Sequence, residues 1–439
     1  MPLEIESHGI NAVPNAHRTQ GCFGLFAMYA GVNICLPMML MGGSFVPGMS
    51  FWQVILCSIL GNAIGFSLTC LSAYAGVDQG LPASVLTRVP LGYPIGTWIP
   101  SVVLAVTLAG WFAVQTELAA MAADGLLLYF TGTSYPLLAI FAMGATNIYF
   151  AVMGFGWMRK LAAFAVPALI VLSILLIVEI TRSFPVLELI SRDGDGDITF
   201  MQALNIIISG QLAGSLSSSD ISRYARKHRS LWLGVVVGVT PVAATITALG
   251  ALSALTSGDW NPVQGVQTLG LGVGALVLII LATWTTNDKN LYSGGLALTN
   301  IFPAWPRWQL TLLLGAVGTV AACFRITDHF LQWLVALGVV FAPLGGVLIA
   351  DYFVVRKRRI LIPELYKDKG KYRFQGGLNW VALAAMAIGL SVRLFVSVEA
   401  LPTIISFLST GLAYVLLMRI FWPAHFSKTS AWHPPKNVE

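Results

Sequence analysis

The sequence predicts an all-α protein that crosses a membrane many times, and three observations support this prediction. Of the 439 residues, 56% are hydrophobic and only 10% are charged, so a water-soluble fold would lack the polar surface to cover itself. Apolar stretches of about 20 residues, each long enough to cross ~30 Å of hydrocarbon, recur along the whole chain. Alternating strand patterns are missing, so helices are expected to satisfy the backbone hydrogen bonds in lipid.

Twelve apolar stretches stand out, and each is expected to form one transmembrane helix. Their predicted ranges are 20–46, 51–77, 96–121, 134–156, 160–182, 199–219, 231–256, 268–297, 308–324, 329–353, 379–398 and 402–421.

The basic residues predict the orientation of these spans. Most of the 25 lysines and arginines lie in loops on the same side as both termini, with dense clusters at 223–229 and 356–373. Basic loops stay in the cytoplasm, so both termini are expected to be cytoplasmic. The net charge of +6 then reflects these loops and does not indicate a nucleic-acid partner.

Spans one and six contain residues that interrupt helices. Span one holds Gly31 and Pro37, and span six holds Gly210 and Gly214 before a run of serines. Glycine weakens a helix and proline removes a hydrogen-bond donor. An unwound segment in a membrane exposes carbonyls for a cation and amides for a polar ligand. Tight helix packing through small residues is the alternative interpretation.

The two interruptions predict how the chain is organised. They lie five spans apart, in helices that run in opposite directions, which is typical of inverted repeats. We expect a five-plus-five inverted repeat with two extra C-terminal helices. The expected parts are a cytoplasmic N-terminal tail (1–19), the first five-helix repeat (20–182), an external loop (183–198), the second, inverted repeat (199–353), a basic cytoplasmic loop (354–378), helices eleven and twelve (379–421) and a cytoplasmic tail (422–439).

Span eight is unusually polar for a transmembrane helix. Its segment 283–298 reads TWTTNDKNLYSGGLAL. Polar and charged side chains at bilayer depth are expensive, and they commonly mark the path of an ion or a substrate. This segment therefore predicts a transporter.

Four local motifs carry a resemblance to a known family. They are GVNICLP at 31–37, GWFAVQ at 110–115, SSDISRY at 218–224 and the span-eight segment. In this order and spacing the chain resembles the nucleobase–cation symporter-1 family, nearest its cytosine permease (purine–cytosine) branch.

The resemblance implies a function as well as a fold. It implies a secondary transporter, not an enzyme, in the plasma (inner) membrane, which imports a nucleobase such as cytosine, another pyrimidine or purine, or a related planar heterocycle. Import would use cation symport, with sodium the expected ion, and alternating access. The alternatives are a proton-coupled or sodium-independent carrier of a hydantoin, allantoin or a vitamin precursor, and an amino-acid or amine carrier of the same fold.

The resemblance also implies a sodium site shared by spans one and eight. The implied ligands are the backbone carbonyls of Ala30, Asn33 and Ala282 and the hydroxyls of Thr285 and Thr286. A hard cation prefers several oxygen ligands, and adjacent hydroxyls beside a helix break supply them. Threonines that bond back to their own helix are the alternative.

The implied substrate site centres on span three. Trp111 would stack on the flat ring, and Gln115, one turn later on the same helix face, would bind its edge. Asn287 and Asn290 of span eight are further candidates for reading that edge. A tryptophan of the interfacial belt is the alternative for Trp111.

The chain departs from the family pattern at two places. Relatives offer an aromatic residue in span six where this chain has Gln211, flanked by Gly210 and Ala213. A second stacking wall is therefore missing or comes from another residue. In the cytosine branch a glutamine precedes the tryptophan by one turn; here Leu108 stands there and Gln115 follows instead, as in hydantoin-type relatives. The sequence leaves the heterocycle open.

Predicted spans three and eight contain three charged residues, Glu117, Asp288 and Lys289. Lys289 follows Thr285 by one turn, and one hypothesis is that it pairs with Asp288 or Glu117 and tunes ion coupling. A neutralised pair that only holds helices together is the alternative. If Lys289 replaced the cation outright, transport would not respond to sodium. Glu117 is also a candidate proton site.

Other classes find little support in the sequence. All six histidines lie at termini or span ends, which disfavours a proton relay through histidine and an intramembrane enzyme. Repeated pore residues typical of a channel are not evident. We expect no cofactor beyond the coupling ion, sodium or a proton, and no partner beyond the lipid bilayer and the substrate; the oligomeric state is not predicted.

Overall fold

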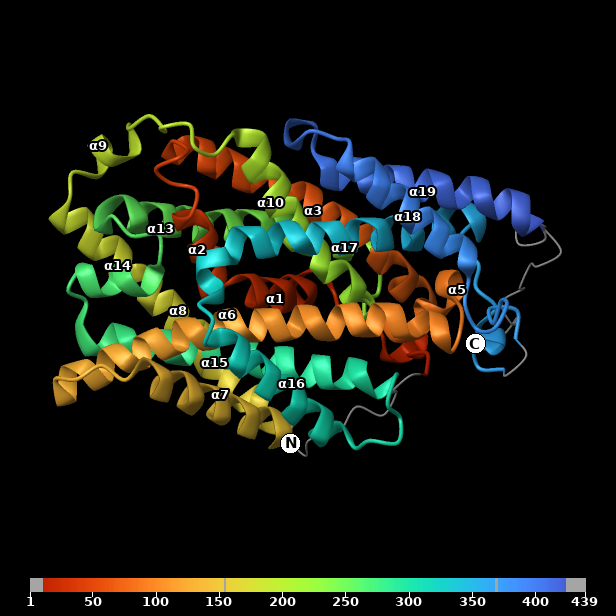
Figure 1. Ribbon diagram of the computed structural model, residues 1–439, viewed down its shortest axis with the longest axis horizontal. Coiled ribbons are helices and arrows are strands. Elements are labelled where there is room, and N and C mark those ends of the chain that lie inside the picture. The colour runs from red at the N-terminus through yellow and green to blue at the C-terminus, as the bar shows by residue number, and fades with distance from the viewer. Residues whose placement is uncertain (1–10, 154, 368–369, 424–439) are drawn as a thin grey trace.

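The computed structural model describes residues 11–153, 155–367 and 370–423, and their regular elements are all helices. The long helices run roughly along one axis, with α9 (Val186–Ile190) and α14 (Pro262–Thr268) at one end and α5 (Arg88–Leu91) at the other (Figure 1). We call the end that carries α5 the basic end, because Arg88, Arg229 and Arg358 lie there. Among the described helices, six are long and apolar enough to cross a membrane, or seven if a bent pair counts as one span.

Each predicted span coincides with one helix or with two consecutive helices. These are α1 (Cys22–Asn33) with α2 (Leu36–Gly43), α3 (Phe51–Gln79), α6 (Trp98–Thr131), α7 (Pro136–Met153), α8 (Phe155–Ser183), α10 (Phe200–Leu212) with η3 (Ala213–Leu216), η4 (Trp232–Val239) with α13 (Thr240–Ser257), α15 (Gly272–Thr299), α16 (Arg307–Ala322), α17 (Phe330–Ala350) with η6 (Asp351–Val355), α18 (Trp380–Leu394) and α19 (Pro402–Phe421). Short helices join them, including α4 (Ala83–Leu86), α11 (Ser218–Ser222), α12 (His228–Leu231) and η5 (Ile326–His329).

The predicted break in span one is confirmed. α1 and α2 meet at an angle of 59°. Ile34 donates its amide hydrogen to the carbonyl of Ala30 (2.8 Å), and Cys35 takes an extended conformation. Pro37 lies in the first turn of α2, where its missing N–H is not needed. The proline therefore starts the second half of the span.

Span six is interrupted later and more gently than its glycines suggest. Gly210 lies inside the regular helix α10, and the chain tightens into a 3-10 turn only from Ala213 to Leu216. A 3-10 turn keeps the direction of the chain while changing its hydrogen bonds. Among the described helix pairs that are together long and apolar enough to cross a membrane, α1 with α2 is the one bent by more than 40°.

The helices pack into two units. In the first, which we call the α3 unit, α3 packs on α10 and α13, α13 on α2, and η4 on α1. In the second, the α15 unit, α15 packs on α6 and α8, and α7 and α16 complete the group. α17 packs on α10, and α18 and α19 cover α17 at the side of the molecule away from α7 and α16 (Figure 1). Each unit draws helices from both predicted repeats.

Small residues bring α2 and α13 into close contact. A Cβ atom on Gly42 would lie 1.8 Å from the carbonyl oxygen of Thr247, and one on Gly250 would lie 1.9 Å from the carbonyl oxygen of Met39. No side chain fits at these distances. The packing interpretation of the span-one glycines thus holds for Gly42, beyond the break itself.

Candidate functional site

The predicted ring-binding pair lies on α6. Trp111 is half-buried, and its ring meets that of Phe330 edge to face, with centroids 6.0 Å apart and an interplanar angle of 73°. Gln115, one turn later, is 2% exposed, and among the described residues its Oε1 has no hydrogen-bond partner. Burying an amide oxygen without a donor costs about 1–3 kcal/mol. Such an atom fits a ligand's N–H group.

Hydrogen bonds fix the register of α15 against α6. Asn287 donates through Nδ2 to the hydroxyl of Thr116 (2.9 Å), and Asn300 donates to the hydroxyl of Ser101 (3.3 Å). The two helices are therefore antiparallel. Residues 288–292 of α15 consequently lie at the same height along the helix axis as Trp111 and Gln115 of α6.

The two predicted edge readers on α15 have unused hydrogen-bonding atoms. In the described part of the chain, Oδ1 of Asn287 and Nδ2 of Asn290 are buried without partners. Asn287 uses its Nδ2 group to donate to the hydroxyl of Thr116. Asn290 is 8% exposed, and among the described residues its Nδ2 group is an unused donor. A free donor and a free acceptor close to the level of Gln115 suit a ring with N–H and carbonyl groups.

The side chain of Gln211 makes hydrogen bonds that join three helices. Its Nε2 donates to Oδ1 of Asn33 (3.2 Å) and to Oδ1 of Asn62 (2.7 Å), so it joins α10 to α1 and α3. Its neighbour Gly210 packs against Leu334 of α17, and Ala213 is buried. These contacts hold the α3 unit together around the break in span one. A substrate role for these three residues stays a prediction.

Two aromatic residues of α17 lie beside the site and were not predicted from the sequence. Phe330 contacts Trp111. The ring of Trp333 packs against Gly110, so closely that a Cβ atom added to Gly110 would lie 2.3 Å from Cζ2 of Trp333. The indole Nε1 of Trp333 is buried and, within the described residues, has no partner. These rings are candidates for the stacking wall that Gln211 does not provide. Their three-residue spacing at the start of span ten was the available signal.

The span-one part of the predicted cation site is a helix C-terminus. The carbonyl of Ala30 accepts from Ile34 and that of Asn33 accepts from Cys35 (3.0 Å). Each oxygen keeps a second lone pair, and the negative end of the helix dipole lies there. This arrangement fits a cation.

On α15, the threonines differ in how they use their hydroxyls. Thr283 bonds back to the carbonyls of Ile279 and Ile280, both at 3.0 Å. Thr286 is half-buried, and the described contacts include no hydrogen bond of its hydroxyl. Back-bonding therefore explains Thr283 but not Thr286, whose oxygen is free for a ligand. The side chain of Thr285 lies outside the described residues, and Ala282 is buried.

The contacts of the described residues do not include the ion pairs hypothesised for Lys289. Glu117 instead accepts from the backbone N–H of Thr327 (3.0 Å) and from its hydroxyl (2.6 Å), which anchors η5 to α6. Asp288 is 0% exposed and, among the described residues, both its carboxylate oxygens lack partners. Neighbouring helical residues point about 100° apart, so Asp288 and Lys289 face different surroundings.

Comparison with known proteins decides the family. The family of permeases for cytosine and purines, uracil, thiamine and allantoin matches residues 12–417. The chain belongs to this family.

The permease also resembles individual members of known function or structure. It is 29% identical to the hydantoin permease of Microbacterium maritypicum, over 92% of this chain and 86% of that one. The inward-facing structure of Mhp1 matches with a TM-score of 0.89 and 25% identity, over 98% of this chain and 97% of that one. The closed structure of Mhp1, a nucleobase-cation-symport-1 family transporter with bromovinylhydantoin bound, matches with a TM-score of 0.82 and 25% identity, over 97% and 98%. The all-helical transporter fold and the non-enzymatic class are thereby confirmed.

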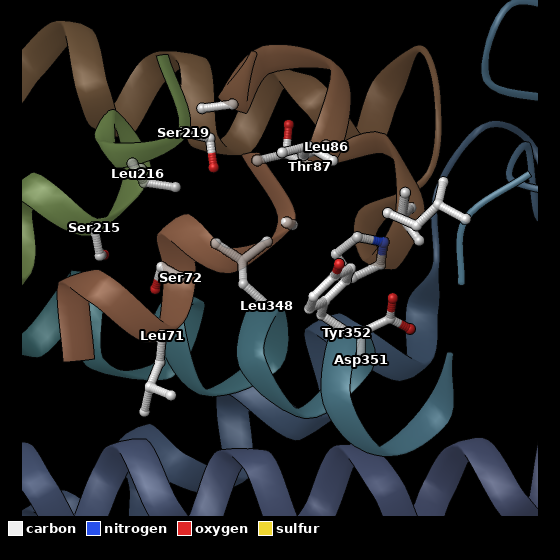
Figure 2. A pocket seen from close by; sticks show the side chains of 15 residues that line it. Leu71, Ser72, Leu86, Thr87, Ser215, Leu216, Ser219, Leu348, Asp351 and Tyr352 are labelled. Carbon is white, nitrogen blue, oxygen red and sulfur yellow. The ribbon is translucent and has the colours of Figure 1, made fainter. Parts of the chain in front are cut away.

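Two cavities of the permease lie away from the site. One of about 210 Å³, at the end opposite the basic end, is lined by Trp260, Thr327 and Phe330 among others. Phe330, which lines this cavity, also contacts Trp111 of the candidate site. The other, of about 40 Å³, lies between α3, α4, η3 and α17 with η6 (Figure 2). It has room for a few waters and is too small for a heterocycle.

An ion-pair cluster lies at the basic end of the permease. Asp78 pairs with Arg358 (2.8 Å) and with His228 (2.9 Å), and it accepts a hydrogen bond from Tyr352. The hydrogen bonds that Arg358 donates to this carboxylate raise the pKa of the guanidinium. The cluster ties α3 to α12 and to the segment after η6.

Proposed function

We propose that this permease imports a nucleobase or a related small planar heterocycle by cation symport. The observation that carries the proposal is the set of unpartnered amide atoms on Gln115 and Asn290 close to the level of the Trp111 ring. A stacking surface beside a free donor and a free acceptor suits a flat ring with N–H and carbonyl groups. The family's named substrates and the hydantoin in the related structure support the same class.

Sodium is the coupling ion that the residues fit best. The carbonyls at the end of α1 and the hydroxyl of Thr286 offer oxygen ligands, which a hard cation prefers. Ala30 and Asn33 belong to the α3 unit, whereas Ala282 and Thr286 belong to the α15 unit. A cation held by both sets favours one relative position of the two units.

Coupling follows from this shared site. We propose that the heterocycle also contacts both units, with Trp111 and Asn290 in the α15 unit and with the backbone amides at the span-one break in the α3 unit. Two ligands that favour the same arrangement increase each other's affinity. Each predicted five-helix repeat contributes to both units, which allows alternating access by movement of one unit against the other.

The orientation follows from charge. We place the basic end and both termini in the cytoplasm, and the permease in the plasma (inner) membrane, because loops rich in lysine and arginine remain cytoplasmic. The higher TM-score with the inward-facing Mhp1 structure supports a conformation that opens toward the basic end.

A ligand screen tests this proposal. We would measure the thermal stability of the purified permease with cytosine, uracil, hydantoin, allantoin and, as a control, phenylalanine, in sodium chloride and in choline chloride. We expect at least one heterocycle to raise the unfolding temperature, and sodium to enlarge the shift. Stabilisation by phenylalanine alone would favour the amino-acid carrier, and a heterocycle shift that follows pH and ignores sodium would favour proton coupling, with Glu117 as the candidate group.

A further inference from the structure

Lys289 stands out as an exposed cation in the middle of α15. Its two chain neighbours, Asp288 and Asn290, are buried, whereas Lys289 itself is exposed. Within the described residues its ammonium makes no hydrogen bond and no ion pair closer than 4.0 Å. A charge at this depth without a close partner is expensive. It therefore needs a functional explanation.

The contacts of α15 show which face Lys289 occupies. Trp284 packs on Phe150 of α7 (5.1 Å between ring centroids), and Gly295 lies against Thr311 of α16. A second face carries Asn287, which bonds to α6. Lys289 lies on neither face, because each residue turns the helix by about 100°. It lies on a third face of α15, together with the candidate cation ligands Ala282 and Thr286.

The geometry of α15 directs the side chain of Lys289 toward the candidate cation site. Side chains in an α-helix lean toward the N-terminus and cover the residues three and four positions earlier. For Lys289 these residues are Thr286 and Thr285. The flexible four-carbon stem of lysine spans about one helical turn of ~5.4 Å. The ammonium can therefore reach the oxygens that would hold sodium.

A carboxylate in the other unit attracts the same ammonium. Asp220 lies in α11, which packs on α3 and so belongs to the α3 unit, and it is near enough to Lys289 for electrostatic attraction. Its Oδ1 also accepts the backbone N–H of Ala83 (2.9 Å) at the basic end. Asp220 thus draws the lysine away from the site and toward the proposed cytoplasmic opening.

We infer that Lys289 is a tethered competitor of sodium, which occupies the cation site when sodium leaves and is held aside by Asp220 when sodium binds. Both cations need the same oxygens, and two unit charges a few ångströms apart repel strongly in a low-dielectric site. Sodium therefore binds only when the ammonium has moved toward Asp220. The return of the ammonium assists the release of sodium toward the basic end. This inference rests on the cation site proposed above.

Sodium titrations of two single variants test the inference, because the two substitutions should change the sodium affinity in opposite directions. We expect K289Q to lower the sodium concentration for half-maximal thermal stabilisation about tenfold, within the range of ordinary coupling between sites. D220N should raise that concentration, because it removes the charge that holds the ammonium aside. The titration uses no heterocycle, so it is independent of the substrate proposal. K289A provides a second neutral variant if K289Q folds poorly.

The double variant and a control complete the experiment. K289Q with D220N should match K289Q alone in the sodium titration, because an asparagine can still accept the backbone N–H of Ala83 and no ammonium is left for the carboxylate to hold. K367Q removes a lysine that pairs with Glu364 in an exposed loop (2.5 Å) and should leave the titration unchanged. A wild-type permease insensitive to sodium that gains a sodium response in K289Q also supports the inference. Equal sodium curves for wild type, K289Q and K289A overturn it, even if a heterocycle binds and the proposed function stands.

Discussion

The interrupted spans and the continuous spans contribute different chemistry to the site. The α1–α2 break offers backbone carbonyls at a helix end, and an amide network from Gln211 holds it in place. The continuous helices α6 and α15 offer side chains instead, with Trp111, Gln115 and Thr286 on regular turns. Backbone ligands depend on the geometry of the break, whereas side-chain ligands can be removed one at a time. The two regions should therefore respond differently to substitution.

The largest effect is expected from the continuous region, in Trp111→Ala. Stacking of a base on an aromatic side chain contributes about 1–3 kcal/mol, so the affinity for the heterocycle should fall about 10- to 100-fold while sodium binding persists. A ligand titration followed by thermal shift measures it. Trp308→Ala is the control, because Trp308 is 48% exposed at the start of α16. Unchanged affinity in Trp111→Ala would contradict the stacking role and leave the family intact.

The second prediction separates two threonines of the same helix. Thr286→Val keeps the shape of the side chain and removes the free hydroxyl, and a bond to a charged partner contributes about 1.5–3 kcal/mol. We expect sodium affinity to fall about tenfold or more. Thr283→Val should leave it nearly unchanged, because that hydroxyl bonds to its own helix. Equal effects of the two changes on a sodium titration would show that Thr286 is not a ligand.

The third prediction concerns the interrupted region. Gln211→Leu leaves the Oδ1 atoms of Asn33 and Asn62 without the shared donor. Each unsatisfied buried acceptor costs about 1–3 kcal/mol, so thermal stability should fall, and both sodium and heterocycle should bind more weakly. Gln332→Leu, at an exposed position of α17, is the control. If only heterocycle binding changed, Gln211 would be a substrate contact and not a support of the break.

The smallest effect is expected where the two helices of the α15 unit are joined. Thr116→Val removes the acceptor of the Asn287 amide. One neutral hydrogen bond contributes about 0.5–1.5 kcal/mol. Without it the side chain of Asn287 is no longer held in one orientation, so the affinity for the heterocycle should fall about two- to tenfold. Thr146→Val, in which a half-buried threonine of α7 loses only a bond to its own helix, is the control. Heterocycle titrations of both variants give the comparison.

Local signals in the sequence were sufficient for the spans and for the first break. Apolar length predicts the helices, and Pro37 in the first turn of α2 marks the bend. α6 runs on to Thr131, beyond its predicted end at 121, because the apolar run after Asp124 continues the helix to Gly132, whose φ of 73° ends it. Asp124 itself accepts from the backbone of Tyr135 (2.5 Å) at the start of α7.

Contacts between distant segments were not predictable from the sequence. Phe330 and Trp333 meet α6 only because α17 packs across it, more than 200 positions later in the chain. The bridge from Gln211 to Asn33 has the same origin, since it joins span six to span one. The hypothesised pair of Lys289 with Asp288 is not among the described contacts, because the side chains of consecutive helical residues point about 100° apart.

The ion pairs of the described residues have a consequence for movement. Apart from pairs within single loops or helix ends, they lie around Asp78, which joins α3 to α12 and to the segment after η6. Among the described pairs, none connects the α3 unit to the α15 unit. Charge nevertheless acts across the surface between the two units through Lys289 and Asp220, which interact electrostatically without forming a close ion pair. The rate at which the permease changes between its two conformations should accordingly respond to ionic strength through this pair of charges, because salt screens charges that water reaches.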